Sequence, residues 1–282
     1  MTDQLLDVDD AALRAAYNRR SFAFQHALHE NSAFDLANLV TLASRIGSAY
    51  TATGSAQVGD GWRSQAPRQS LAETVAAMPS SDALVLLKGL EDDRDYGQIF
   101  RRVLAEVVEA VGDTLRADIE KARATLIISS PRRVTPYHID AETNFLLQLR
   151  GEKIVNVFDP FDRTVLTETE LEAFYSGDLS AARYREERQV DAATFHFGPG
   201  MALHIPLHAP HWVRNGDAVS VAISINCSLR SNARRARVYK INAMLRRRGL
   251  SPAPPGVCGW RDGYKVALAS AHEGARRLRL VT

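Results

Sequence analysis

The chain has 282 residues, 45% of them apolar, which is enough to bury a full hydrophobic core without disulfide bonds. Its 35 Lys and Arg residues nearly balance its 33 Asp and Glu residues, so the net charge of +2 gives no reason to expect nucleic acid or a membrane as the main partner. Only two cysteines occur, Cys227 and Cys258, and we expect both to be free thiols.

The first 17 residues are acidic and contain no apolar run, which argues against a secretory signal. No stretch approaches the roughly 18 consecutive apolar residues that a membrane-spanning helix needs. We therefore expect a cytoplasmic protein.

Apolar residues recur at helical spacing over residues 9–46, which predicts a helical N-terminal section. Residues 53–70 are rich in Gly, Ser and other polar residues and predict a loop. Further elements are expected at 71–78 (a helix), 83–87 (a short strand) and 96–111 (an amphipathic helix). We expect this helical section, residues 1–120, to pack on the remainder of the chain.

The pattern changes at residue 124, where short segments rich in β-branched and aromatic residues are divided by Gly, Pro and Asp. The predicted strands are 124–130, 144–149, 153–158, 194–197, 202–205 and 219–227. This spacing is typical of a small antiparallel barrel or a double-sheet jelly roll. We predict a mostly β fold in which residues 121–230 form the barrel, with helices flanking it at both ends.

Two helical additions follow from the pattern. Residues 169–186 predict an insertion that is either a lid over the barrel or a surface helix. Residues 231–282 predict a C-terminal helical extension, with helices at 231–248 and 263–280. The apolar stripe of the first of these helices (Val238, Ile241, Met244 and Leu245) suits a homodimer interface or packing against the chain's own barrel. The arginines beside the stripe suit an acidic partner or a solvated helix face.

The most informative motif is VTPYHID, in which His138 and Asp140 stand two residues apart. In extended backbone such residues point to the same side, so both can face one interior point. A later histidine, His208 or His211, would complete a set of two imidazoles and one carboxylate. That set leaves three coordination positions for a bidentate co-substrate and oxygen, and it suits Fe(II). An isolated His-x-Asp pair is more often a surface or capping feature.

Four segments in combination resemble a known family: TPYHID at 135–140, NFLLQLRGEK at 144–153, GPG at 198–200 leading to His211, and SIN at 224–226. Over residues 124–228 they are similar to the jumonji-C and cupin-like 2-oxoglutarate-dependent oxygenases, especially the factor-inhibiting-HIF-like hydroxylases. The resemblance implies a cupin barrel (a double-stranded β-helix) with Fe(II) and 2-oxoglutarate as cofactors. It also implies hydroxylation of an unknown small-molecule or protein substrate.

The resemblance assigns His138, Asp140 and His211 as iron ligands, and it favours His211 over His208 because the family's ligand directly precedes a pair like Trp212-Val213. His196 and His204 are expected to be ordinary strand residues.

The resemblance also assigns the co-substrate pocket. Lys153 would pair with the distal carboxylate of 2-oxoglutarate, and it opens an apolar strand, where a buried ammonium needs such a partner. Thr135 resembles a hydroxyl donor to the same carboxylate, and Asn144 and Asn226 resemble amides that line the pocket. An exposed edge-strand lysine and ordinary strand or turn roles are the alternatives for these four residues.

Two other functions are compatible with this barrel. A non-catalytic metal-binding or regulatory protein of the cupin kind would keep the metal cradle without turnover, although the complete triad together with Lys153 favours an enzyme. A metal-dependent isomerase would not require Lys153.

Overall fold

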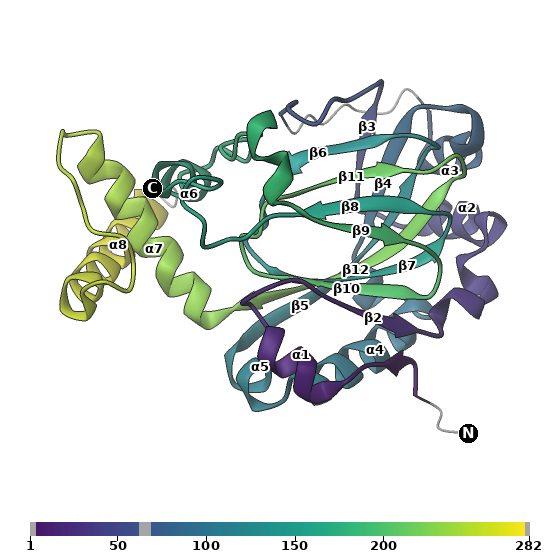
Figure 1. Ribbon diagram of the computed structural model, residues 1–282, viewed down its shortest axis with the longest axis horizontal. Coiled ribbons are helices and arrows are strands. Elements are labelled where there is room, and N and C mark those ends of the chain that lie inside the picture. Colours follow the sequence, from purple (N-terminus) through teal and green to yellow (C-terminus); the bar gives the residue numbers. More distant parts are fainter. Residues whose placement is uncertain (1–3, 62–68, 280–282) are drawn as a thin grey trace.

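The computed structural model describes residues 4–61 and 69–279, which form two antiparallel sheets with helices around them (Figure 1). The larger sheet has eight strands in the order β1-β2-β10-β7-β12-β5-β4-β3, and the smaller has four in the order β6-β11-β8-β9. The larger sheet consists of β1 Leu6–Asp7, β2 Phe22–His26, β3 Ala49–Thr53, β4 Ala83–Lys88, β5 Ile119–Ser129, β7 Thr143–Arg150, β10 Met201–Ile205 and β12 Ser220–Leu229. The smaller consists of β6 Val134–His138, β8 Lys153–Val157, β9 Ala193–Phe197 and β11 His211–Asn215.

The helices lie outside the two sheets (Figure 1). They are α1 Asp10–Ala16, α2 Leu36–Arg45, α3 Leu71–Ala76, α4 Tyr96–Val111, α5 Asp113–Asp118, α6 Glu168–Tyr175, α7 Arg230–Arg246 and α8 Gly259–Arg279. None of the described helices is long and apolar enough to cross a membrane.

Strand β7 illustrates how the sequence places the two layers. Its residues are buried on both faces, and alternate side chains enter different parts of the core. Phe145 and Leu147 pack with residues of α2 and α4 on the outer face of the larger sheet. Leu146 packs between the sheets with Val155 and Val213 of the smaller one. The inner face of β7 therefore contributes to the barrel interior, where the candidate site lies.

The turn from β7 to β8 depends on Gly151. Its φ of +68° lies in the left-handed region, and a Cβ at this position would stand 2.4 Å from the carbonyl oxygen of Val219. Only glycine fits this turn without movement of the backbone. The tight turn sets Lys153 at the first position of β8.

The N-terminal section contributes more strands than its sequence indicates. Residues 9–46 are not continuously helical, because β2 lies within them and pairs with β10. Strand β3 pairs with β4 at the opposite edge of the same sheet. Part of the predicted loop at 53–70 lies outside the described residues, and the division of the chain at residues 120 and 230 stays a prediction.

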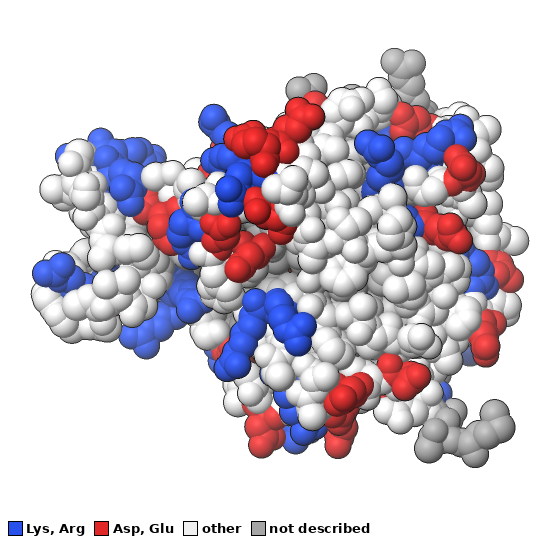
Figure 2. Space-filling model, viewed as in Figure 1, with Lys and Arg blue, Asp and Glu red and all other residues white. Residues whose placement is uncertain are grey.

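The C-terminal helices α7 and α8 project from the barrel (Figure 1). On the face shown in Figure 2, Lys and Arg side chains prevail over acidic ones on this projection. Val238 and Ile241, part of the stripe considered for a homodimer, are buried within the chain itself. Glu172 accepts two hydrogen bonds from Arg246, of 2.7 and 2.9 Å, and so joins α6 to α7.

Candidate metal centre

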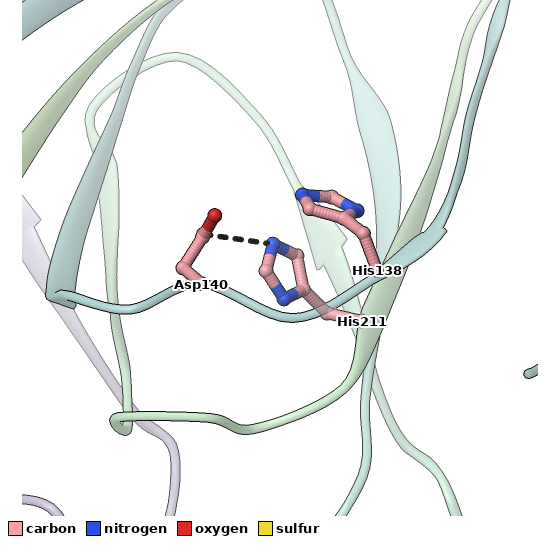
Figure 3. Close-up of side chains that lie close together, drawn as sticks. All are labelled: His138, Asp140 and His211. Carbon is pink, nitrogen blue, oxygen red and sulfur yellow. Dashed lines mark ion pairs between the residues drawn. The ribbon is translucent and has the colours of Figure 1, made fainter. Parts of the chain in front are cut away.

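His138 and His211 meet because β6 and β11 are antiparallel neighbours. His138 is the last residue of β6, His211 is the first of β11, and the two are paired in register. Asp140 follows β6 by two residues, as the spacing in the sequence required. The three side chains point toward one another inside the barrel (Figure 3).

One potential ligand atom from each of the three residues lies within 4.8 Å of the others. Nε2 of His211 is 3.7 Å from Oδ2 of Asp140, and the two imidazole rings have centroids 4.1 Å apart. These separations leave room for one ion between the three side chains, and two imidazoles with one carboxylate are the donor set typical of non-haem Fe(II) sites.

Backbone carbonyl groups orient both imidazoles. Nδ1 of His138 lies 2.7 Å from the oxygen of Pro136, and Nδ1 of His211 lies 3.0 Å from the oxygen of Ala209. A carbonyl only accepts, so each Nδ1 carries the proton and each Nε2 offers a lone pair. Burial, reinforced by the nearby His138, lowers the pKa of His211 to about 4, although Asp140 opposes this shift. The His211 ring is therefore neutral near pH 7, as metal binding requires.

The triad faces a cavity of about 620 Å³ between the two sheets. All four residues expected to hold the co-substrate, Lys153, Thr135, Asn144 and Asn226, line this cavity. The structure therefore brings together every site residue that the sequence singled out, and their roles in binding stay proposals.

Lys153 is the most unusual of the lining residues. It is only 5% exposed, and its Nζ has no hydrogen-bond or ion-pair partner among the described residues. Burial lowers the pKa of Lys153 from 10.5 to about 7. The alternative of an exposed edge-strand lysine is wrong, because β8 lies between β11 and β9 and the side chain is enclosed.

Asn144 and Asn226 face each other across β7 and β12. Nδ2 of Asn144 donates to Oδ1 of Asn226 at 2.7 Å and to Oγ of Ser224 at 2.6 Å. Oδ1 of Asn144 is buried and accepts no hydrogen bond from the described residues. Asn144 therefore keeps an unused acceptor in the wall of the cavity.

The other histidines lie elsewhere. His208 points away from the triad, and its Nε2 contacts the hydroxyl of Tyr175. His204 is fully buried, but Nε2 accepts from the backbone N–H of Asn18 and its ring stacks on Tyr17 outside the cavity. His196 is exposed. The preference for His211 over His208 agrees with this geometry.

The sequence interpretation missed part of the cavity wall. Tyr50 of β3, Lys88 of β4, Arg123 of β5 and Glu142 also line it, as do the insertion residues Phe174 and Leu179. Burial, with Asp140 nearby, raises the pKa of Glu142. Period-two alternation along 123–129 was the available signal for Arg123. The strand expected at 83–87 is present as β4, but the sequence did not indicate β3 or that the two strands extend the larger sheet.

No protein-family model matches the sequence, and no curated protein is significantly similar to it. Among solved structures, E. coli YcfD matches with a TM-score of 0.56 and 14% identity, over 95% of this chain and 68% of that one. The ribosomal oxygenase YcfD in complex with cobalt and 2-oxoglutarate matches with a TM-score of 0.53 and 14% identity, over 90% of this chain and 61% of that one. The complex with cobalt and succinic acid gives a TM-score of 0.52 at 14% identity, over 95% and 67% of the respective chains.

A Lactobacillus farciminis oxalate decarboxylase matches with 20% identity over 37% of this chain and 23% of its own, at a TM-score of 0.25, which is too partial for any argument. At 14% identity, the likeness to YcfD shows the fold alone. Together with the two antiparallel sheets and the flanking helices, it confirms the predicted fold. The chain is a cupin, or jelly-roll, barrel similar in architecture to a ribosomal oxygenase.

Proposed function

We propose that this protein is an Fe(II)- and 2-oxoglutarate-dependent oxygenase that hydroxylates a substrate bound in the cavity. One observation carries the proposal: the cavity that the triad faces also encloses a lysine without a partner. A metal site alone would suit many cupin proteins. The buried ammonium adds a specific requirement for an anionic ligand at a second point of the same cavity.

The triad residues fit Fe(II) by the chemistry of their donor atoms. His138 and His211 would each offer Nε2, with their tautomers held by the carbonyl groups of Pro136 and Ala209, and Asp140 would offer a carboxylate oxygen. Bound iron would supply the oxygen chemistry, while the barrel supplies the orientation of the ligands and the cavity that the triad faces. Three donors on one side leave the opposite side free for other ligands.

Lys153 and Thr135 would hold the far carboxylate of 2-oxoglutarate. Both line the cavity, Lys153 on β8 and Thr135 on β6, the two strands that flank β11 in the smaller sheet. A carboxylate beside Lys153 would favour the charged ammonium and so offset its desolvation. The ribosomal oxygenase YcfD, a solved structure of the same fold, is in complex with cobalt and 2-oxoglutarate, which supports 2-oxoglutarate as the co-substrate. Asn144 and Asn226 would complete the wall of the cavity.

The proposal extends to the hydroxylase group that the sequence resembles, and to a small-molecule or protein substrate. The cavity wall away from the triad combines apolar and charged side chains, including Tyr50, Leu179 and Arg123. Leu179 is 62% exposed, so the cavity reaches the surface beside the insertion that follows β8. A substrate would enter there with its reactive carbon directed toward the triad.

The test is an anaerobic titration of the purified protein with Fe(II) and then 2-oxoglutarate. Chelation of triad-bound iron by the keto acid gives a weak visible charge-transfer band, and we expect that band to saturate at one equivalent of each. Release of succinate under oxygen would then establish turnover. Metal binding without the band would instead favour a non-catalytic or isomerase cupin.

A further inference from the structure

The loop between β10 and β11 carries a second histidine whose side chain faces outward. His208 adopts a φ of +64°, a conformation that costs a non-glycine residue free energy unless its surroundings hold it. It is 6% exposed, and its Nε2 contacts the hydroxyl of Tyr175 at the end of α6. A buried polar contact of this kind, outside the cavity, has no place in the proposed chemistry.

The contact continues into a chain of hydrogen bonds. The hydroxyl of Tyr175 donates to Oδ1 of Asn232 on α7 at 2.9 Å. Nδ2 of Asn232 donates to the backbone oxygen of Ala141 at 2.7 Å. Because the hydroxyl proton of Tyr175 goes to Asn232, Nε2–H of His208 is the donor to Tyr175. Every bond thus has one donor and one acceptor, from His208 to Ala141.

Both ends of this chain lie next to metal ligands. Ala141 directly follows Asp140, and His208 directly precedes Ala209, whose carbonyl accepts from Nδ1 of His211 at 3.0 Å. This chain of hydrogen bonds therefore connects the segment that follows Asp140 with the loop that precedes His211, through Tyr175 of α6 and Asn232 of α7.

The bridge is held by rigid packing. The rings of Tyr175 and Tyr239 are stacked, with centroids 5.4 Å apart and planes 7° from parallel. Asn232 is 5% exposed, so its amide has no competing water. Burial lowers the pKa of His208 to about 3, which keeps its imidazole neutral and suited to donate through a single N–H.

We propose that Tyr175, Asn232 and His208 are positioning residues, which fix the separation of Asp140 from His211 and thereby set the affinity and geometry of the metal centre. This inference rests on the proposed function, because it requires that the triad binds a metal. The helical insertion and the C-terminal helix, which pack on Tyr137, Ile139 and Trp212 beside the ligands, thus support the site from outside. Residues outside the ligand set that orient the ligands commonly change metal affinity by about 10–100-fold.

The test compares two asparagines on the same helix. Asn232→Ala removes the hydrogen bond to Ala141, whereas Asn242→Ala removes a bond of the same type, from buried Nδ2 to the backbone oxygen of Ala253 at 3.0 Å, away from the site. Co(II) is the probe, because its visible absorption reports both affinity and coordination geometry. We expect Asn232→Ala to weaken Co(II) binding about tenfold and to alter the shape of the band. Asn242→Ala should lower the melting temperature similarly and leave Co(II) binding unchanged.

A second pair removes only a hydroxyl group. Tyr175→Phe breaks the bridge at its centre and keeps the stacked ring, and Tyr96→Phe removes the bond from a tyrosine hydroxyl to the backbone oxygen of Ala33 in the N-terminal core. Only the first should change Co(II) affinity and the spectrum. This pair decides the matter if Asn232→Ala fails to fold.

The outcomes separate the two proposals. Absence of Co(II) and Fe(II) binding in the unaltered protein would refute the proposed function itself. If Tyr175→Phe binds Co(II) as tightly as the unaltered protein and gives an identical spectrum, the positioning role is refuted and the proposed function stays intact.

Discussion

The buried polar side chains on the two sides of the metal ligands differ in their hydrogen bonding. On the outer side His208, Tyr175 and Asn232 satisfy one another and the carbonyl of Ala141. On the cavity side Lys153 and Oδ1 of Asn144 are buried and have no partner within residues 4–61 and 69–279.

Unsatisfied buried polar groups cost stability, and at the wall of a cavity a ligand can supply the missing partner. The closed network outside is therefore assigned to structure, and the open set inside to binding. The same contrast distinguishes His208, which belongs to the closed network, from His211, which belongs to the triad.

The largest effect on Fe(II) binding should come from replacing each of the two histidines, His208 and His211, by a smaller residue. His211→Ala removes a ligand and should abolish Fe(II) binding, whereas His208→Asn, which tolerates the left-handed backbone, should weaken it about tenfold through the lost bridge. Isothermal titration with Fe(II) under argon measures both. Retained binding in His211→Ala, together with loss in His208→Asn, would reverse the assignment of the third ligand.

The next effect concerns Lys153. We expect Lys153→Met to weaken 2-oxoglutarate binding about 100-fold while Fe(II) binding persists, because the metal ligands stay in place. Since the buried ammonium has no partner among the described residues, the same change should stabilise the unliganded protein, and most strongly below pH 7, where Lys153 is charged in both states. Lys121→Met, on an exposed position of β5, is the control and should change neither property. If Lys153→Met binds 2-oxoglutarate with unaltered affinity, Lys153 does not hold the co-substrate.

The pH dependence of stability tests the same residue independently. Burial lowers the pKa of Lys153 to about 7 in the folded chain, against 10.5 for an exposed lysine. Between these values the unfolded chain binds one more proton, so the free energy of unfolding contributed by Lys153 rises with pH, by at most about 1.4 kcal/mol per pH unit. The destabilisation is therefore complete below pH 7 and disappears toward pH 10.5. The free energy of unfolding, measured by denaturant melts between pH 7 and 10, should rise more steeply with pH in the wild type than in Lys153→Met. Equal slopes in the two proteins would contradict the lowered pKa of Lys153.

Much of the site was predictable because its signals are local. His138 and Asp140 are separated by two residues, and extended backbone alone places them on one side. Runs rich in β-branched and aromatic residues, divided by Gly, Pro and Asp, indicated β5, β7, β8, β9, β10 and β12, but not β6 and β11, which carry His138 and His211. Lys153 was predictable as the start of an apolar strand after a glycine turn.

The remaining features depend on contacts between distant segments. The run Phe22–His26 is too short to stand out within an apolar pattern of helical spacing, and it becomes a strand because β10 offers a free edge. Tyr175 and Asn232 stand in a helical insertion and an arginine-rich helix, 57 residues apart. Neither segment carries a motif, so only the fold shows that the two residues together link His208 to Ala141, next to Asp140.

The smallest expected effect on 2-oxoglutarate binding concerns Thr135. Thr135 lines the cavity on β6, paired with Val213 of β11, and Thr135→Val replaces only its hydroxyl by a methyl group of similar size. Loss of one hydrogen bond of about 1 kcal/mol should weaken 2-oxoglutarate binding about fivefold. Thr194→Val is the matched control, because Thr194 lies on β9 of the same sheet and its hydroxyl donates to Asn156 outside the cavity. Titration of the iron-loaded variants with 2-oxoglutarate measures the effect, and full affinity in Thr135→Val would leave Lys153 as the sole residue proposed to hold the far carboxylate.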